Sequence, residues 1–109
     1  MKANAKKKTC RVTIYAHPKE EVQEMYLCGE NHASGEWNAE LSTKMKLTSN
    51  GWRAIKVLPM GETFEFKVSR TNSWEGVEKG IWGEEIPNHI IVAAKGLVIN
   101  MDIPSFRKD

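Results

Sequence analysis

The chain has 109 residues, which is enough for one hydrophobic core but not for two. Hydrophobic residues at 40% and charged residues at 28% are typical of a globular protein, and a formal net charge of +2 is too small to indicate a nucleic-acid partner. No stretch approaches the ~18 apolar residues of a membrane helix, so we expect one domain with neither a nucleic-acid nor a membrane partner.

The chain begins with a lysine run, Lys6-Lys7-Lys8, that is typical of a solvated tail. No apolar segment follows this basic start, so the sequence predicts no signal peptide and does not by itself indicate a compartment. A module taken from a secreted glycan-active protein would work outside the cell or in the periplasm. We expect residues 1–9 to be disordered and residues 10–109 to form the folded domain.

Strand-like segments follow one another, separated by turn residues every 8 to 12 positions, which is the pattern of an all-β sandwich. The turns contain Gly, Pro or Asn, the residues that supply special backbone dihedrals. In chain order, the predicted strands are 11–16, 23–29, 43–47, 52–58, 63–70, 77–79, 89–92 and 97–103.

The first two predicted strands contain the two cysteines, Cys10 and Cys28. Pairing the apolar faces of 12–16 and 25–27 puts Cys10 on the apolar face and Cys28 on the opposite one. We therefore expect two free thiols. Two cysteines without histidines at ligand spacing also predict no metal site.

The segment 63–70 shows the clearest strand pattern. Phe64, Phe66 and Val68 point one way, and Glu65 and Lys67 point the other. The alternation therefore predicts that Lys67 stands on a solvent face.

Four tryptophans are a high content for a chain of this length. Trp52 opens an apolar strand and is expected in the core, whereas Trp37 and Trp82 lie in loops among Gly and Glu residues. Large aromatic side chains in such loops have little to pack against, so we expect both to be exposed. Trp74 follows Asn72-Ser73, and its surroundings are left open.

An exposed indole suits a sugar, because the C–H face of a pyranose ring is apolar and flat. Two indole planes set at an angle match the curvature of a helical α-glucan better than one plane does. If each covers on the order of 100 Å² of sugar, burial contributes roughly 2 to 3 kcal/mol apiece before the cost of association.

Enzyme signatures are missing: the sequence has no nucleophile elbow, no P-loop, no dinucleotide fingerprint and no zinc-protease motif. We expect no catalytic residue and no cofactor. A glycosidase-like carboxylate pair could come from Glu78, Glu84 and Glu85, but a sandwich of this size offers little depth to raise one pKa. Three histidines are expected at the surface: His17, His32 and His89.

Several motifs in order resemble the starch-binding domain of carbohydrate-binding module family 20, over about residues 11 to 103. The resemblance rests on residues 25–29 (Met-Tyr-Leu-Cys-Gly), 35–38 (Gly-Glu-Trp-Asn), Trp52, 58–68 (Leu-Pro-Met-Gly-Glu-Thr-Phe-Glu-Phe-Lys-Val) and 82–89 (Trp-Gly-Glu-Glu-Ile-Pro-Asn-His).

The resemblance implies an immunoglobulin-like β-sandwich of seven to eight antiparallel strands that binds an α-glucan as a monomer, without catalysis. By matching positions, Trp37 and Trp82 are the stacking pair. Lys67 and Asn88 would donate hydrogen bonds to sugar hydroxyls, and Glu84 would accept one.

Some residues depart from the family pattern: one extra residue separates Trp82 from Pro87, and His89 replaces the usual Arg. The stretch 69–88 also resembles accessory domains fused to bacterial esterase-like hydrolases. A second hypothesis therefore stays open, in which the same sandwich is a protein-interaction or spacer module that contacts a catalytic domain of the same or another chain.

Overall fold

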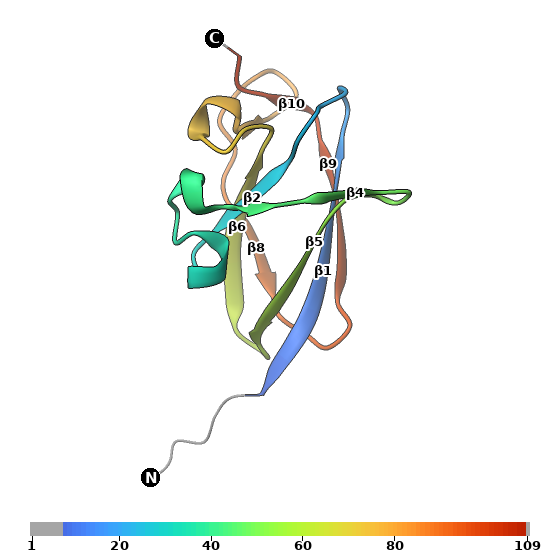
Figure 1. The fold of residues 1–109 in the computed structure, drawn as a ribbon, viewed down its shortest axis with the longest axis vertical. Helices are drawn as coiled ribbons and strands as arrows, with labels where there is room; N and C mark the ends of the chain where they lie inside the picture. The colour runs from blue at the N-terminus through green and yellow to red at the C-terminus, as the bar shows by residue number, and fades with distance from the viewer. Residues whose placement is uncertain (1–7, 109) are drawn as a thin grey trace.

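Two four-stranded β-sheets pack against each other around one core (Figure 1). The computed structural model describes residues 8–108. The strand orders are β4-β5-β1-β9 and β3-β2-β6-β8, and β10 pairs with β7 in a small third sheet. The strands are β1 (Thr9–Pro18), β2 (Tyr26–Gly29), β3 (Thr43–Lys44), β4 (Lys46–Thr48), β5 (Gly51–Pro59), β6 (Thr63–Ser69), β7 (Glu78–Lys79), β8 (His89–Val92), β9 (Val98–Ile103) and β10 (Ser105–Phe106). Three short 3₁₀ helices complete the fold: η1 (His32–Ser34), η2 (Ala39–Leu41) and η3 (Trp74–Gly76).

The first sheet is organised around β1, which pairs antiparallel with β5 and parallel with β9. Alternate residues of β1 are buried, among them Val12 and Ile14, because one face of the strand lines the core. The predicted all-β sandwich is confirmed, although the parallel pair of β1 and β9 differs from a purely antiparallel arrangement. It arises because the chain crosses from the second sheet to the first between β8 and β9.

The second sheet shows the alternation expected for the segment 63–70. Phe64, Phe66 and Val68 are buried in the core, and Glu65 and Lys67 are partly exposed on the opposite face. The prediction for Lys67 is confirmed.

The predicted strand 43–47 is two strands in the structure, β3 in one sheet and β4 in the other. Met45 lies between them, with 2% of its surface exposed. In Figure 1 this segment crosses the molecule from one sheet to the other. A buried methionine at the crossing keeps the core continuous between the two sheets.

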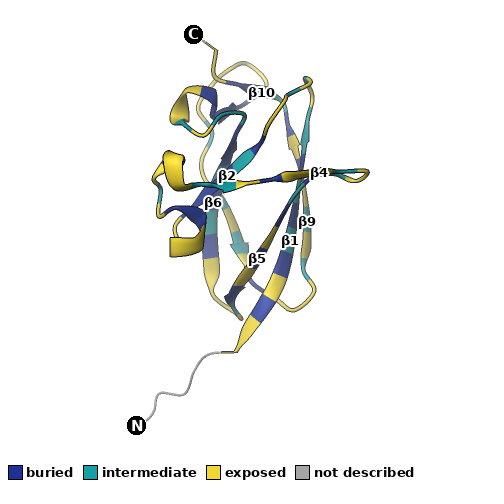
Figure 2. Ribbon diagram, in the orientation of Figure 1, coloured by how far each residue is buried: buried dark blue, intermediate teal, exposed yellow. Residues whose placement is uncertain are grey.

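The core contains Trp52, which confirms its prediction, and Cys10. In Figure 2 buried and exposed residues alternate along the long strands, and the short helices are mostly exposed. The two thiols are free, as expected. Cys28 opposite Lys67 has its side chain on the outer face, although it is buried there beneath a loop.

The expected pairing of the first two strands is wrong. β1 pairs with β5 and β9, whereas β2 pairs with β3 and β6 in the other sheet. The apolar faces of β1 and β2 meet across the core instead of side by side, which the alternation of apolar residues does not distinguish. The boundary expected at residue 9 remains a prediction: β1 begins at Thr9, and residues 1–7 lie outside the described part of the chain.

Candidate functional site

The outer face of the β3-β2-β6-β8 sheet combines charged side chains with loops that bear aromatic rings. Glu65 and Lys67 point out of β6, and Cys28 of β2 lies opposite Lys67 in the register. Directly opposed residues in antiparallel strands share a face, so these side chains have a common surface.

The loop between β2 and β3 lies over part of this surface and carries Trp37. The backbone N–H of Trp37 donates to the carbonyl of Gly29, 3.0 Å away, which holds the loop against the end of β2. Glu36 and Trp37 have positive φ angles of 50° and 66°, and Gly35 precedes them at 90°. Non-glycine residues adopt this region only when neighbours fix them, and such residues cluster at functional sites.

The loop around Trp37 also covers Cys28. Burial raises the pKa of the Cys28 thiol, and a hydrogen bond with the Trp37 backbone partly offsets that increase. Cys28 is therefore a neutral packing residue under the loop at neutral pH. Trp37 itself is only partly exposed, less than its polar sequence context predicts.

The aromatic neighbour of Trp37 is Trp74, which begins η3 in the loop after β6. The two ring centroids are 6.5 Å apart and the ring planes are inclined by 33°. Trp74 is 37% exposed. Two partly exposed indoles thus form one aromatic surface beside the outer face of the sheet.

Trp82 stands elsewhere, on a tight turn after β7, and is 88% exposed. Gly83 donates its N–H to the carbonyl of Gly80, and a carboxylate oxygen of Glu84 accepts the backbone N–H of Trp82 at 2.8 Å. The hydroxyl of Ser105 donates to the carbonyl of Gly80, so the turn lies beside β10. The exposure predicted for Trp82 is confirmed, and the Glu84 carboxylate stabilises the turn that presents it.

Asn88 stands just before β8 and is exposed. Its side-chain amide donates to a Glu65 carboxylate oxygen at 3.3 Å, and another acidic residue, Glu30, accepts the backbone N–H of Glu65 at 3.0 Å. Asn88 therefore belongs to the same outer face as Glu65 and Lys67.

Glu85 lies in the segment between β7 and β8, and its carboxylate pairs with the ammonium group of Lys79. The hydrogen bond and the charge of Lys79 lower the pKa of the Glu85 carboxyl, and the charge of Lys67 lowers it further. Lys67 therefore lies within electrostatic range of Glu85.

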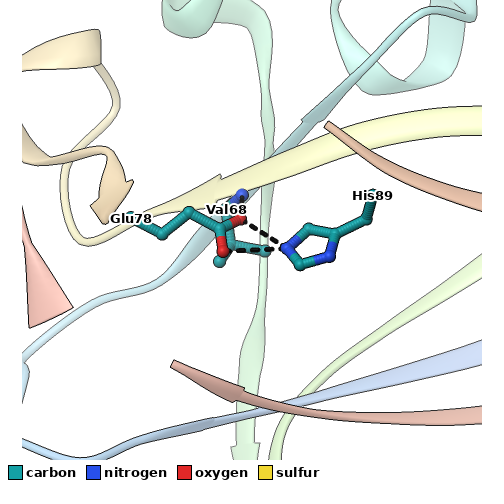
Figure 3. Close-up of polar contacts among 3 residues, drawn as sticks. All are labelled: Val68, Glu78 and His89. Carbon is teal, nitrogen blue, oxygen red and sulfur yellow. Dashed lines mark hydrogen bonds and ion pairs between the residues drawn. The ribbon is translucent and has the colours of Figure 1, made fainter. Parts of the chain in front are cut away.

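A buried carboxyl group hydrogen-bonded to a histidine anchors the segment between β7 and β8 (Figure 3). The Glu78 side chain is 1% exposed, and His89 Nε2 lies 2.8 and 2.9 Å from its two oxygens. Glu78 also accepts the backbone N–H of Val68 at 2.8 Å, and the His89 ring stacks on Phe66. The expectation of a surface histidine holds only in part for His89, whose side chain is 28% exposed and is bonded to the buried Glu78.

A buried lysine on β5, Lys56, holds the two ends of the loop that carries Trp37. Lys56 is 5% exposed and donates to the carbonyl of Ala33 at 3.2 Å and to the hydroxyl of Thr43. Burial lowers the pKa of the Lys56 ammonium group. This lysine ties the start of the Trp37 loop and the start of β3 to the strand β5.

Among residues 8–108, no group of three or more His, Cys, Asp or Glu side chains is arranged to hold a metal ion. No helix within the described residues is long and apolar enough to cross a bilayer.

Comparison with protein families identifies the chain. The sequence model of the starch binding domain family matches residues 9–99 of the chain. The chain belongs to this family of starch-binding domains. No curated protein sequence matches the chain.

Solved structures share the fold of this starch-binding domain. The family 20 carbohydrate-binding module of a maltotetraose-forming amylase from Pseudomonas saccharophila matches with a TM-score of 0.64 at 19% identity, covering 85% of this chain and 99% of that one. A glycoside hydrolase family 15 glucoamylase from Hypocrea jecorina matches with a TM-score of 0.67 at 16% identity, covering 92% of this chain and 17% of the glucoamylase. A gamma-CGTase from alkalophilic Bacillus clarkii matches with a TM-score of 0.66 at 19% identity, covering 92% of this chain and 15% of the gamma-CGTase. The domain thus spans less than a fifth of the glucoamylase and of the gamma-CGTase.

Of the residues expected to bind sugar, Lys67, Asn88 and the loop of Trp37 lie on one face of the starch-binding domain. Among the described residues, Trp37 makes its aromatic contact with Trp74, and Trp82 makes none. Sequence reasoning left Trp74 open, although its setting between Ser73 and Glu75 is as polar as that of Trp37.

Proposed function

We propose that this starch-binding domain is a non-catalytic module that holds an α-glucan on exposed tryptophans. In this proposal Trp37 and Trp82 stack on pyranose rings, Lys67 and Asn88 donate hydrogen bonds to hydroxyls, and Glu84 accepts one. The observation that supports it most directly is the position of Trp37, whose partly exposed indole is held beside the face that carries Lys67.

The surface suits a sugar chain better than a compact apolar ligand. An indole plane offers a flat apolar contact, and ammonium and amide groups around it can bond the hydroxyls at the edge of a pyranose ring. The site is shallow, so association costs remove much of the stacking energy, and we expect a Kd from about tens of micromolar to about millimolar.

The carboxylates of this region already have structural partners, which supports a non-catalytic role. Glu78 is buried against His89, Glu84 bonds the backbone of Trp82, and Glu85 pairs with Lys79. A glycosidase needs two carboxyl groups that both face the scissile bond. The buried Glu78 carboxylate does not meet this requirement.

Sedimentation with insoluble starch tests the proposal. We expect the wild-type domain to pellet with starch and Trp37→Ala and Trp82→Ala each to reduce the bound fraction. Ile55→Ala is a matched control, since Ile55 is 43% exposed on the opposite sheet. A wild-type domain that stays in the supernatant would contradict glucan binding, and mutants that pellet like the wild type would contradict the residue assignment.

The outer face of the other sheet supports a second candidate, a protein-interaction or spacer module. Ile55, Val57 and Val98 are 43%, 59% and 53% exposed on β5 and β9, and the glucoamylase that shares the fold is a much longer chain. This function predicts concentration-dependent self-association or binding to a catalytic domain that Val57→Lys abolishes, with tryptophan fluorescence unchanged by maltoheptaose. Size-exclusion chromatography across a range of concentrations, with and without maltoheptaose, separates the two candidates.

A further inference from the structure

A groove lies at the end of the sandwich where β1 begins. The start of β1 forms it together with the β5–β6 turn at Met60 and the β8–β9 turn at Lys95 and Gly96. Its volume is about 840 Å³, which is within the range of ligand-binding clefts. In Figure 1 both turns lie at the same end of the molecule as the start of β1, and β10 lies at the opposite end.

The charges that border this groove all have the same sign. Among the described residues, its lining contains no acidic side chain and three cationic ones, Lys8, Arg11 and Lys95. All three are exposed, and within residues 8–108 none of them forms an ion pair. Elsewhere in the domain cations do have carboxylate partners, as Lys79 has in Glu85. The groove therefore gathers positive charge that the described part of the domain does not neutralise.

An apolar strip continues from the groove across the outer face of the first sheet. Thr13 lines the groove and lies between Ile55 of β5 and Val98 of β9 in the strand register. Val57 follows Ile55 on the same face of β5, and all three aliphatic side chains are exposed, as is Met60 in the groove. An apolar centre bordered by charged groups is the composition of a protein–protein interface.

We propose that this groove and strip bind an acidic segment of a partner protein, in which a short aliphatic run lies next to a cluster of Asp or Glu. The carboxylates pair with the three cations, and the aliphatic side chains cover the strip. This inference rests on the second candidate function and names the chemistry of its partner. It does not depend on glucan binding, because Trp37 and Lys67 belong to the other sheet and its loops.

Other anionic partners match the groove less well. A bilayer takes up apolar side chains that protrude, whereas Met60 lies in a hollow. Single-stranded nucleic acids are held by aromatic side chains as well as by cations, and the described lining contains no aromatic residue. A polypeptide with carboxylates and aliphatic side chains satisfies both halves of the surface, and its charges would steer association.

Fluorescence anisotropy with a labelled synthetic peptide and the full chain tests the proposal. The probe has a run of Val and Leu followed by a run of Glu. One control peptide has Lys in place of Glu, and the other has Ser in place of Val and Leu. We expect the probe to bind and each control to bind at least about tenfold more weakly. Raising the ionic strength to about 1 M, where the Debye length falls to about 3 Å, should also weaken binding of the probe.

Charge-reversal variants locate the binding surface. Arg11→Glu and Lys95→Glu should each weaken binding of the probe by about threefold to tenfold, because an attraction becomes a repulsion. Lys46→Glu makes the same change at an exposed position of β4, and Lys2→Glu makes it near the start of the chain. Both controls should bind the probe nearly as the wild type does.

Several outcomes would overturn the inference. Equal binding of the probe and either control peptide would remove the acidic or the aliphatic requirement. A loss in Lys46→Glu or Lys2→Glu as large as in Arg11→Glu would show a response to net charge alone. Tighter binding of phosphatidylglycerol vesicles or duplex DNA, lost in Arg11→Glu, would assign the groove to a membrane or to nucleic acid. A domain that pellets with starch but binds no probe would reject this inference and leave glucan binding intact.

A measurement on the wild-type domain keeps the test valid if a variant fails to fold. In ¹H–¹⁵N NMR spectra, the probe should shift the amide resonances of Arg11, Val57 and Gly96 and leave those of Trp37 and Lys67 in place. Added maltoheptaose should not displace the probe. Shifts centred on Trp37, or competition by maltoheptaose, would place the peptide on the proposed sugar site and contradict the inference.

Discussion

The loops that carry Trp37 and Trp74 rest beside the outer face of the β3-β2-β6-β8 sheet, whereas the turn that carries Trp82 lies beside β10. Trp37 and Trp74 are in contact and only partly exposed, and their loops are fixed by left-handed backbone and by hydroxyl networks. Trp82 is almost entirely exposed, and its backbone N–H is held by the Glu84 carboxylate.

The Trp37 and Trp74 loops and the Trp82 turn therefore expose their aromatic rings in two different ways. A preorganised pair offers a fixed surface at low entropy cost, while a ring on an open turn must lose its motion on binding. We expect changes near the first region to alter stability and affinity together, and changes at the tip of the Trp82 turn to have small effects on stability. The following predictions test that contrast.

The largest effect should come from the base of the segment that carries Trp82, where it enters the core. His89→Phe keeps a ring against Phe66 but leaves the buried Glu78 carboxylate without its partner. Leaving a buried hydrogen-bonding group without its side-chain partner costs about 1 to 3 kcal/mol, and more if the group is charged, so we expect a loss of about 3 kcal/mol. Urea unfolding measures it.

A second substitution identifies the cause of that loss. In the His89→Phe background, Glu78→Gln replaces the carboxyl group with a neutral amide and keeps an oxygen for the Val68 N–H, so about 1 kcal/mol or more should return. If the double variant is no more stable than His89→Phe, the loss reflects packing rather than the unpartnered Glu78 side chain.

Two glycines with positive φ compare the regions directly. A Cβ at Gly35 would lie 2.8 Å from the Asn38 carbonyl oxygen and 2.9 Å from backbone atoms of Leu41, whereas a Cβ at Gly83 meets nothing within 4 Å. Gly83→Ala should cost about 1 kcal/mol, from the left-handed backbone alone. Gly35→Ala should cost at least about 2 kcal/mol, because the backbone must also shift.

Thermal unfolding of the two glycine variants measures the contrast, since each kcal/mol lowers Tm by about 4–8 °C in a domain of this size. Gly35→Ala should also weaken starch binding through Trp37. Equal Tm values for the two variants would show that the loops around Trp37 and Trp82 are equally adaptable.

Most of the fold could be predicted from the alternation of apolar residues. The segment 63–70 predicted both the core face of β6 and the solvent position of Lys67, and the apolar run after Asn50-Gly51 placed Trp52 in the core. Sheet membership could not be predicted, because apolar faces that meet across a core look the same in sequence as faces that pair side by side.

The candidate site was predicted less well, because its geometry depends on contacts between loops. The approach of Trp74 to Trp37 requires the turns after β6 and β2 to converge, which no local pattern encodes. The burial of Lys56 could have been predicted, since Lys56 follows Trp52 and Ala54 and precedes Leu58 at alternate positions on the core face of β5. A lysine in that series predicts a buried ammonium group with polar partners.

Lys56 provides a pH-dependent test of how the Trp37 loop is held. Burial lowers the pKa of Lys56 in the folded state, so the unfolded chain binds more protons between that lowered value and the ordinary lysine pKa of about 10.4. Stability contributed by this residue should therefore rise with pH across that interval.

Lys56→Met should remove that rise while changing stability at pH 7 by only about 1 kcal/mol. The methionine loses the hydrogen bonds of the ammonium group but also removes the cost of desolvating it, and the two effects largely cancel. Urea unfolding at pH 7 and at pH 10 measures the change. Lys46→Met is the control, since Lys46 is exposed on β4. Parallel pH profiles for the wild type and Lys56→Met would contradict a buried ammonium group.

The smallest effect is expected at Glu85, in the segment that carries Trp82. Its carboxyl pKa is lowered chiefly by the hydrogen bond and charge of Lys79, and the side chain is largely exposed. A lowered folded-state pKa stabilises the domain above the unfolded value of about 4.3, and this contribution is lost as the pH falls through the folded value.

Glu85→Gln should therefore lower Tm slightly at pH 7, by less than Gly83→Ala does, and the difference from the wild type should disappear in acid. Solvent screens an exposed pair, which keeps the effect small. Thermal unfolding at pH 7 and pH 3 measures it. A loss at pH 7 as large as that of Gly35→Ala would mean that the Trp82 turn is as firmly built as the loop of Trp37, and the contrast between the two regions would then fail.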